Sequence, residues 1–577
     1  MQNKILMITL GIHDGHTATA CLMCDGRILA CISEERLNRI KEYGGFPEKA
    51  IQKCMEMARI KANQIDGIGI VGLMEPTLPN SYNAPHISKR IFAAATSFIP
   101  ESFFQSDMWV APAQKIIGSL RNRAKFKSCF SKLGMNSEPT FYEHHYLHAV
   151  TAHYLSWFGI DDNLIITCDG SGDAVCATVN IAKGNEIKRV QEISNYNSIG
   201  EFYTQITQFL GMKPMSHEYK VMGLAPYAKE EHAQKTLRIF ESFFDVNGSS
   251  PMSFKNTSGC WKWRYIDRFQ NILRGHRFDN IARAAQMLVE NILVEWISNC
   301  VRHTGIKKVV LSGGVFMNVK ANNAILDIPE IEQLFILPSC GDESLAIGAA
   351  IIKSVELGCT KIDPIGPLYF GPEYSEEEIQ EALNKNARDL TYTKIEHIEE
   401  CIAKELSEGK AVARFANKME WGARSLGNRS ILADARNRDI ILKINEAIKN
   451  RDFWMPFAPS IMDECEKDYI QNPKDYYSPY MIMAFPTKEK AKTDLIAGLH
   501  PYDFTARPQI VRRDWNPSYY ELLKTFKRIT GVGGILNTSF NLHGEAIACS
   551  PEDAIYTFTH SALDGLAIGN FYVKKKN

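Results

Sequence analysis

The chain of 577 residues is 45% hydrophobic and 23% charged, which predicts a globular protein of roughly two to four domains. Its 66 basic and 66 acidic residues give a net charge of zero, which excludes a general nucleic-acid or membrane-surface binder. No apolar run approaches the roughly 18 residues of a membrane span, and the 14 scattered cysteines favour free thiols in a reducing cytoplasm.

The first elements are predicted to be a strand and a β-hairpin. Residues 4–12 form an apolar run, and residues 17–23 and 27–33 form alternating runs on either side of Asp25-Gly26. An Asp-Gly pair between two such runs is the strongest short-range signal for a hairpin. Actin-like ATPase folds begin with the same order of elements. The loop after the first strand carries His13, Asp14 and His16.

A histidine-rich segment at residues 143–149 is the first candidate site. Residues four apart on a helix share one face, with Cβ atoms roughly 5–6 Å apart, so His144 and His148 can hold one metal ion. Two aspartates in glycine-containing loops, Asp169 and Asp342, can complete the shell, and such a site suits phosphate or nucleotide chemistry. About 0.4 such histidine pairs are expected by chance, so a helix with one buried and one exposed histidine is the alternative.

Later elements repeat the opening pattern. Residues 163–167 are predicted as a strand that leads into the first aspartate loop, and residues 174–181 continue it, which indicates a duplicated domain. An amphipathic helix is predicted over residues 279–303 and a strand over residues 307–311. The glycine loop that follows, residues 312–318, either brings the backbone close to a ligand or only makes a tight turn.

A domain boundary is predicted between residues 355 and 375, where prolines and glycines accumulate. Ser375, followed by Glu378 three residues later, has the spacing of a capping box and starts a predicted helix. A helix at residues 398–407 and a strand at residues 411–415 follow. The region after the boundary is therefore a second α/β unit.

Cationic groups gather in this second region. The loop at residues 418–430 contains Arg424 and Arg429 among glycines and serines, so it is either an anion cradle or a surface turn with solvated charges. Further cationic and polar residues follow, namely Lys449, Arg451, Arg507 and the run from Asn537 to Asn541.

Together these motifs resemble the O-carbamoyltransferases of the nodulation protein U and tobramycin carbamoyltransferase family. The resemblance covers nearly the whole chain, and each motif is modest by itself, whereas so many in order are specific. The segments that carry it are residues 16–22, 34–41, 144–149, 218–227, 313–318, 424–430, 456–459 and 536–541.

The resemblance implies an α/β fold with two lobes. Residues 1–360 are expected to form an actin-like (ASKHA, duplicated ribonuclease H-like) carbamoyl-transfer lobe, and residues 365–577 a YrdC-like lobe. The second lobe would convert carbamoyl phosphate and ATP into carbamoyl adenylate. The first lobe would transfer the carbamoyl group to a hydroxyl of a natural product or sugar. The implied cofactors are ATP and a divalent metal, iron(II), with magnesium accompanying ATP in the second lobe.

The resemblance also implies roles for individual residues. The residues that match the family's metal ligands are His144, His148, Asp169 and Asp342. Those that match its adenylate site are Glu218, Lys220, Gly313, Gly314 and Asn318. Those that match its carbamoyl phosphate and ATP site are Arg424, Lys449, Arg507, Asn537 and Ser539. His16 matches the histidine beside the acceptor hydroxyl, and His13 and Asp14 can orient or replace it.

Two features concern the substrates. Met455 stands where the family usually has arginine before its Pro-Phe-Ala-Pro run, and the loss of this cation is expected to weaken carbamoyl phosphate binding unless Arg451 compensates. The insert at residues 73–135, with Phe103, Phe104 and Trp109, is an acceptor-facing surface, a packed cap or a surface for a partner. No nucleic-acid or membrane partner is expected, and a homodimer is compatible with the sequence.

Two other functional classes remain open from the sequence. A zinc hydrolase can use the same histidine pair, but the HExxH arrangement is missing because His145 follows His144 and no glutamate lies before His148. An ATP-dependent switch of the actin class can use the glycine loops, but it would not need a second lobe with an arginine-rich pocket. Pyrophosphate release that depends on carbamoyl phosphate would separate these classes from the carbamoyltransferase.

Overall fold

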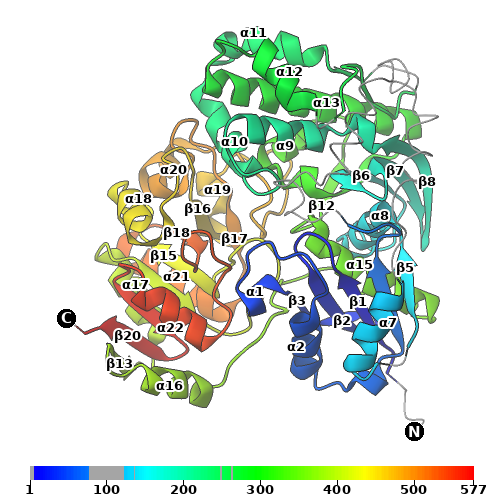
Figure 1. Cartoon of the computed structure of the whole chain (residues 1–577). Helices are drawn as coiled ribbons and strands as arrows, with labels where there is room; N and C mark the ends of the chain where they lie inside the picture. The colour runs from blue at the N-terminus through cyan, green and yellow to red at the C-terminus, as the bar shows by residue number, and fades with distance from the viewer. Residues whose placement is uncertain (1–5, 77–122, 136, 247–249, 262–263, 577) are drawn as a thin grey trace. The chain divides into compact units, whose positions relative to one another are not determined.

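The computed structural model describes residues 6–76, 123–135, 137–246, 250–261 and 264–576 (Figure 1). The chain forms two compact units, the first from Met1–Glu34 and Glu42–Ile365 and the second from Glu35–Lys41 and Gly366–Asn577. All 14 cysteines are free, as predicted. Within the described ranges, no helix is both long and apolar enough to span a bilayer.

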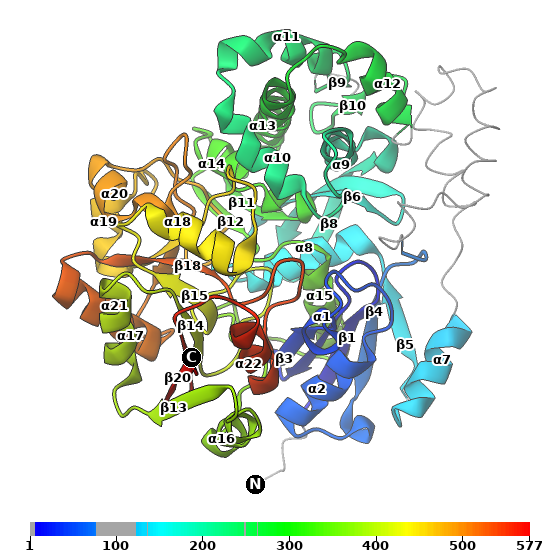
Figure 2. The same cartoon turned by 60° about the vertical axis from the view of Figure 1, so that its left-hand side comes forward.

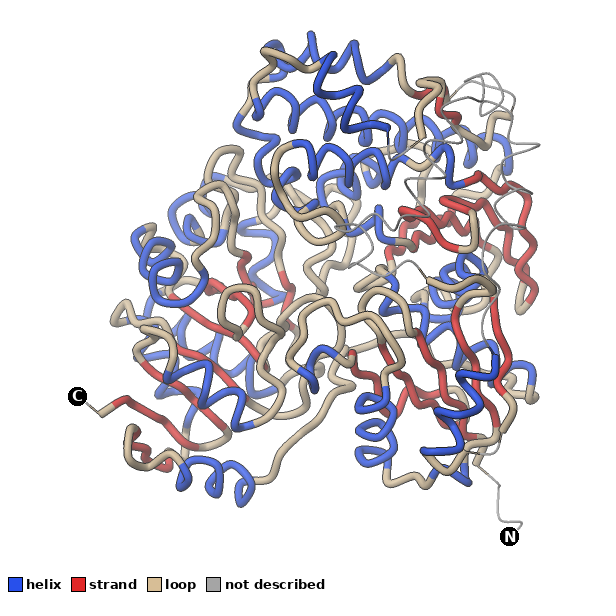
Figure 3. Tube along the Cα trace, viewed as in Figure 1, coloured by secondary structure: helices blue, strands red, loops and turns tan. Residues whose placement is uncertain are grey.

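The first unit contains two five-stranded sheets, visible as separate groups of strands in Figure 3. The order in the first sheet is β3-β2-β1-β4-β5, with β1 antiparallel to β2 and parallel to β4. Its strands are β1 (Ile8–His13), β2 (Thr19–Cys24), β3 (Arg27–Ser33), β4 (Gly67–Val71) and β5 (Pro139–Tyr142). The predicted hairpin is confirmed, since Asp25 and Gly26 have φ angles of 45° and 79°, as a type I′ turn requires.

The first strand begins later than the sequence predicts. The apolar run starts at residue 4, but β1 starts at Ile8, and Leu6 remains 56% exposed. Helix α2 (Glu48–Ala58) packs against β2 and β3, and α15 (Leu345–Glu356) packs against β1 and β4. Gly11 permits the close contact with α15, because a Cβ atom there would lie 1.8 Å from the Ala346 carbonyl oxygen.

The second sheet repeats the first. Its order is β12-β11-β6-β7-β8, and β6 pairs antiparallel with β7 and parallel with β11. The strands are β6 (Asn163–Gly172), β7 (Val175–Lys183), β8 (Glu186–Ser194), β11 (Lys308–Ser312) and β12 (Gln333–Ile336). Read from β8, the order and the pairing are those of the first sheet. The duplication predicted from the sequence is therefore present, and both sheets are mixed, within the α/β class.

A group of helices adjoins the second sheet, and Figures 1 and 2 both show these helices gathered together. They are α9 (Ile199–Phe209), α10 (Glu218–Leu224), α11 (Glu230–Glu241), α12 (Tyr265–Ile272) and α13 (Phe278–Thr304). The ring of Phe202 packs edge-on against Phe240 and Phe269 at centroid distances of 5.2 and 5.9 Å. Helix α13 confirms the predicted helix with one more residue at each end, and Gly305, with φ of 71°, terminates it.

The second unit is built on one eight-stranded sheet with the order β13-β20-β19-β14-β15-β18-β16-β17. Its strands are β13 (Leu390–Lys394), β14 (Val412–Phe415), β15 (Arg429–Ala433), β16 (Ala458–Met462), β17 (Gln509–Val511), β18 (Gly534–Ser539), β19 (Gly565–Ile568) and β20 (Phe571–Lys575). Helix α17 (Ile398–Ser407) matches the prediction and packs against α21 (Pro517–Thr530). The predicted capping box of Ser375 and Glu378 starts α16 (Glu376–Lys385).

A short segment from the N-terminal region belongs to the second unit. It contains α1 (Glu35–Asn38), which follows β3 in the chain. Arg36 donates to the Gly422 carbonyl at 2.9 Å, and Arg39 donates to the carbonyls of Ala546 and Ile547 at 2.7 Å each. The boundary expected from the sequence did not include this excursion, because a segment of seven polar and apolar residues carries no local signal of the unit it packs with.

Candidate functional site

The first turn of α8 (His144–Leu155) is fixed by side chains around it. Glu143 caps the helix by accepting hydrogen bonds from the backbone N–H groups of His145 (3.1 Å) and Tyr146 (2.6 Å). Arg189 forms an ion pair with the same carboxylate at 2.5 Å. One helical turn separates His144 from His148, and their ring centroids are 4.9 Å apart. The predicted placement of both imidazoles on one face is confirmed.

Two carboxylates converge on these two imidazoles. Asp169 Oδ2 lies 3.2 Å from His144 Nε2 and 3.4 Å from His148 Nε2, and Asp342 Oδ1 lies 3.6 and 3.9 Å from the same nitrogens. The four ligand atoms all lie within 4.8 Å of one another. Metal–ligand bonds of about 2.1 Å place neighbouring ligands about 3.0–3.4 Å apart, so the spacing fits one ion. Imidazole with carboxylate is a donor set for iron, zinc or manganese.

The electrostatics of these four residues also fit a cation. Burial disfavours the charged form of His144, but Asp342, Asp169 and Asp173 together outweigh it and raise its pKa to about 9. Burial lowers the pKa of His148 to about 4. Burial also raises the pKa of Asp342 well above its ordinary value, and the charge of Asp169 adds to this effect. A proton on His144 therefore offsets part of the negative charge that a divalent ion would neutralise.

Neighbouring residues hold the imidazoles in place. His148 Nδ1 lies 3.1 Å from Ser312 Oγ at the end of β11, which leaves Nε2 directed toward the carboxylates. Gly172 lies under the ring of His144, since a Cβ atom there would be 2.1 Å from His144 Cγ. His145 faces elsewhere: its Nδ1 contacts Thr167 Oγ1 at 2.8 Å. Burial lowers the pKa of His145 well below its ordinary value, so this residue is a neutral part of the core.

The predicted catalytic loop lies beside this group. His13, at the end of β1, is buried, and its Nε2 is 3.8 Å from Asp342 Oδ2. The same nitrogen lies 3.0 Å from the carbonyl oxygen of His16 and donates to it. Asp14 is buried, and His16 is half-buried, with its Nε2 atom away from solvent. The hydrogen bond from His13 to the His16 carbonyl favours His13 as the residue that orients the loop.

The glycine loop after β11 has a structural reason for its first glycine. Gly313 has φ of 113°, and a Cβ atom there would lie 2.2 Å from the Cys168 carbonyl oxygen. At Gly314 a Cβ atom would lie 2.8 Å from Asp169 Oδ1. Both glycines therefore allow this loop to lie close to the Asp169 loop. Of the two alternatives for the glycine loop, close approach to a ligand or a tight turn, the tight turn accounts for Gly313.

The remaining residues of the predicted adenylate set lie on two helices of the same unit. Asn318 caps α14 (Val319–Leu326), and its amide exchanges two hydrogen bonds of 3.0 Å with Gln286. Glu218, the first residue of α10, accepts from Thr204 Oγ1 at 2.9 Å, and burial raises its pKa. Lys220 follows on the same helix and is partly exposed.

Replacing Gly313 by alanine is expected to weaken divalent metal binding by about 10- to 100-fold, because the new Cβ atom must displace the loop that holds Asp169. Titration of the protein with cobalt(II) measures this change. Gly358→Ala is the control, because Gly358 has a similar φ of 100° but no atom within 4 Å of the added Cβ. Equal metal affinity in both variants would show that the contact with Cys168 does not matter.

In the second unit, five cationic side chains lie close enough to affect one another's pKa. Lys449 is 2% exposed, and its ammonium donates to Ser539 Oγ at 3.1 Å and Asn541 Oδ1 at 2.9 Å. Burial, followed by the charges of Arg451 and Lys41, lowers the pKa of Lys449. Burial, followed by the charges of Arg424 and Arg451, lowers the pKa of Arg507 well below its ordinary value.

The buried guanidinium of Arg507 indicates that an anion binds there. Its Nη1 atom is buried without a hydrogen-bond acceptor among the residues that the structure describes. A guanidinium held among other cations is destabilised until an anion binds, and planar guanidinium groups match phosphate oxygens in pairs. The arrangement favours an anion cradle over the alternative of a solvated surface turn.

Two predicted members of this site have different surroundings. Ser539, at the end of β18, contacts the ammonium of Lys449 through its hydroxyl. Asn537 is 2% exposed, and its amide donates to Ser425 O, Ser460 Oγ and Gln509 Oε1 at 3.0–3.2 Å. Asn537 therefore connects β18 to β16, to β17 and to the loop that contains Arg424. This role accounts for its burial.

Met455 is 9% exposed and packs in the core of the second unit. Arg451 donates to Thr538 Oγ1 at 3.2 Å, and its guanidinium lies over the ring of Phe457 at 5.1 Å. Arg451 thus contacts the Pro-Phe-Ala-Pro run itself, and compensation for the missing arginine stays a prediction. Phe103, Phe104 and Trp109 of the predicted acceptor-facing insert lie outside the described residues.

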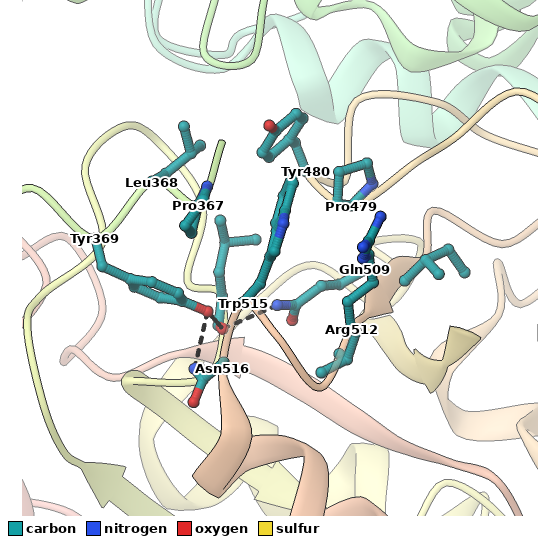
Figure 4. A pocket seen from close by; sticks show the side chains of 12 residues that line it. Pro367, Leu368, Tyr369, Pro479, Tyr480, Gln509, Arg512, Trp515 and Asn516 are labelled. Atoms are coloured by element: carbon teal, nitrogen blue, oxygen red, sulfur yellow. Dashed lines mark hydrogen bonds between the residues drawn. The ribbon is translucent and has the colours of Figure 1, made fainter. Parts of the chain in front are cut away.

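A small pocket that no sequence motif predicted lies elsewhere in the second unit (Figure 4). Tyr369, Tyr480 and Trp515 form its aromatic walls, and Asn516 donates to the Tyr369 hydroxyl at 2.9 Å. Its volume is about 10 Å³, enough for one water molecule. None of the predicted site residues lines it.

Comparison with known proteins supports the resemblance seen in the sequence. A family model described as the carbamoyltransferase N-terminus matches residues 4–351, and one described as the carbamoyltransferase C-terminus matches residues 403–575. An uncharacterized protein of Methanocaldococcus jannaschii is 31% identical over 99% of this chain and 100% of its own length. Nodulation protein NolNO of Sinorhizobium fredii is 30% identical over 100% of this chain and 81% of its own length. The 3′-hydroxymethylcephem-O-carbamoyltransferase of Amycolatopsis lactamdurans is 27% identical over 46% of this chain and 48% of its own length.

Proposed function

Because the chain belongs to the carbamoyltransferase family and is an enzyme of that class, we propose that it is an ATP-dependent O-carbamoyltransferase with one half-reaction in each unit. The second unit, as a YrdC-like domain, forms carbamoyl adenylate. The first unit, as an actin-like domain, transfers the carbamoyl group to a hydroxyl. The observation that carries the proposal is the convergence of His144, His148, Asp169 and Asp342 in the first unit.

The cations of the second unit suit the first half-reaction. Water releases carbamate and phosphate from carbamoyl phosphate, and a carbamate oxygen attacks the α-phosphorus of ATP, which expels pyrophosphate. Arg424, Lys449 and Arg507 hold the phosphate oxygens of the two substrates, and Ser539 orients the ammonium of Lys449. Magnesium accompanies ATP in this unit.

The residues of the first unit suit the second half-reaction. His144, His148, Asp169 and Asp342 hold a divalent metal, for which iron(II) is the candidate, and this ion supplies a Lewis acid for the phosphate of the leaving AMP. Gly314 and Asn318 position the adenylate, together with Glu218 and Lys220 on α10. His16 accepts the proton of the acceptor hydroxyl as its oxygen attacks the carbamoyl carbon, while His13 orients the loop.

The acceptor class is proposed from the relatives alone. One relative is named for a hydroxymethylcephem and others for nodulation, so a small hydroxylated molecule is the candidate acceptor. A screen of hydroxylated metabolites, with each product weighed for one added carbamoyl group, would identify it.

Product analysis tests the proposed function. The purified protein with carbamoyl phosphate, ATP, iron(II) and an acceptor is expected to release pyrophosphate and AMP in equal amounts. Release depends on carbamoyl phosphate, because carbamate is the nucleophile that attacks ATP. Formation of ADP instead would refute the adenylate route, and ester or peptide hydrolysis without ATP would support the hydrolase. Nucleotide binding without pyrophosphate release would support the switch.

A further inference from the structure

Asp173 and Ala174 form the two-residue turn between β6 and β7, next to the metal ligands. Gly172 pairs with Val175 across this turn, and Asp173 and Ala174 have φ angles of 50° and 69°, as a type I′ hairpin turn requires. The turn places the side chain of Asp173 beside His144, the first residue of α8.

The carboxylate of Asp173 accepts hydrogen bonds from three backbone N–H groups. Oδ2 accepts from His144 at 2.9 Å, and Oδ1 accepts from Met74 at 2.8 Å. The N–H of Leu73 is 3.0 Å from both oxygens. His144 is the first residue of α8, so its N–H has no partner within the helix, and a carboxylate there is favoured by the helix dipole.

The same carboxylate fixes a segment that reaches the catalytic loop. Residues 73–76 leave β4 through Gly72, whose φ is 86°. Pro76 lies against Gly15, because a Cβ atom on Gly15 would be 3.2 Å from Pro76 Cβ and 2.7 Å from His13 Cε1. Asp173 thus links the metal helix to the segment that covers the loop with His13.

We propose that Asp173 is a positioning residue for carbamoyl transfer, which holds His144 in its ligating orientation and seats residues 73–76 against the catalytic loop. This inference rests on the proposed function, because it assigns the transfer step to the first unit. Backbone donors make all of these contacts, so the side chains at positions 73 and 74 do not determine them. Loss of the carboxylate affects the metal site and the transfer step, whereas adenylate formation in the second unit does not depend on it.

The test compares Asp173→Asn and Asp173→Ala with Asp66→Asn in the full-length protein. Asp66 is the matched control, since its carboxylate also accepts a backbone N–H, that of Ile8 at 2.7 Å, but in the first sheet. Cobalt(II) titration reports metal affinity, and the cobalt absorption spectrum reports the ligand geometry. We expect Asp173→Ala to weaken cobalt binding about 10- to 100-fold and to shift the spectrum, with a smaller effect for Asp173→Asn, which keeps one acceptor oxygen.

Activity measurements complete the test. In both Asp173 variants, carbamoyl transfer is expected to fall while pyrophosphate release stays within about twofold of the wild type. The inference is overturned if the variants keep the cobalt affinity and spectrum of Asp66→Asn, or if both half-reactions fall together. Absence of pyrophosphate release from the wild-type protein would refute the proposed function instead, and the cobalt comparison would still decide the role of Asp173.

Discussion

Replacing His148 by alanine is expected to abolish carbamoyl transfer and to leave carbamoyl adenylate formation unchanged. His148 Nε2 lies 3.4 Å from Asp169 Oδ2 and 3.9 Å from Asp342 Oδ1, so it supplies one of the four metal ligands. Charge stabilisation by a bound metal amounts to several kcal/mol, and its loss corresponds to a fall in transfer rate of about 10²- to 10⁴-fold. Carbamoylated product and pyrophosphate, quantified in the same reaction, measure the two steps.

His153→Ala is the matched control for this experiment. His153 lies on the same helix and is fully buried, but its Nε2 contacts the Gly184 carbonyl at 2.8 Å, away from the aspartates. Both variants lose a buried imidazole, so a similar loss of stability is expected in each. Equal loss of the two half-reactions in His148→Ala would contradict the division of labour between the units. An unchanged transfer rate in His148→Ala would show that carbamoyl transfer does not need a metal at this site.

Replacing Arg507 by methionine is expected to lower adenylate formation by about 10²- to 10³-fold while the protein becomes no less stable. The buried Nη1 atom of Arg507 lacks an acceptor, and burial with repulsion from Arg424 and Arg451 disfavours its charge. Methionine fills a similar volume without the charge, and such replacements of buried charges are often neutral or stabilising. Pyrophosphate release and the melting temperature without substrates measure the two effects.

Arg512→Met is the control for Arg507. Arg512 lies five residues later, but its guanidinium already pairs with Asp514 at 2.8 Å and its side chain is 43% exposed. We expect its loss to leave both half-reactions unchanged. A large drop in melting temperature for Arg507→Met would mean that the guanidinium supports the fold. An unchanged rate of pyrophosphate release would exclude Arg507 from the substrate site.

Much of the local structure could be predicted from the sequence because its signals are short-range. The Asp25-Gly26 pair predicted the first hairpin, because its turn needs a left-handed backbone. The spacing of Ser375 and Glu378 predicted the start of α16. The helix α13 followed from apolar periodicity. The strand order could not be predicted in this way, since β11 pairs with β6 across more than one hundred residues that give no local indication of the partner.

The candidate site was predictable where a motif and a geometric rule coincide. The spacing of His144 and His148 implies a shared helix face whatever the fold, whereas the convergence of Asp169 and Asp342 on them depends on how the strands are arranged. The resemblance to a family placed those aspartates, and spacing alone would not have done so. The amide of Asn537, a predicted member of the anion site, also donates hydrogen bonds to residues of neighbouring strands, a role that only tertiary contacts reveal.

Supporting residues were missed for a physical reason. Asp173 and Ser312 act through backbone amides and an imidazole that are distant in the sequence, so no pattern of residue types marks them. Glu143 was the one exception that could have been found, because a carboxylate just before a helix is favoured by the dipole of its first turn.

The second unit is not a continuous piece of polypeptide, and this has a consequence for any attempt to dissect the enzyme. Arg36 and Arg39 bond to carbonyl groups of the second unit although they are encoded between strands of the first. A C-terminal fragment expressed from residue 366 onward would lack these anchors and also Lys41, whose charge acts on Lys449. Fragments cut at residue 366 are therefore poor models of the two separate activities. A C-terminal fragment would regain these contacts only if residues 35–41 were added to it.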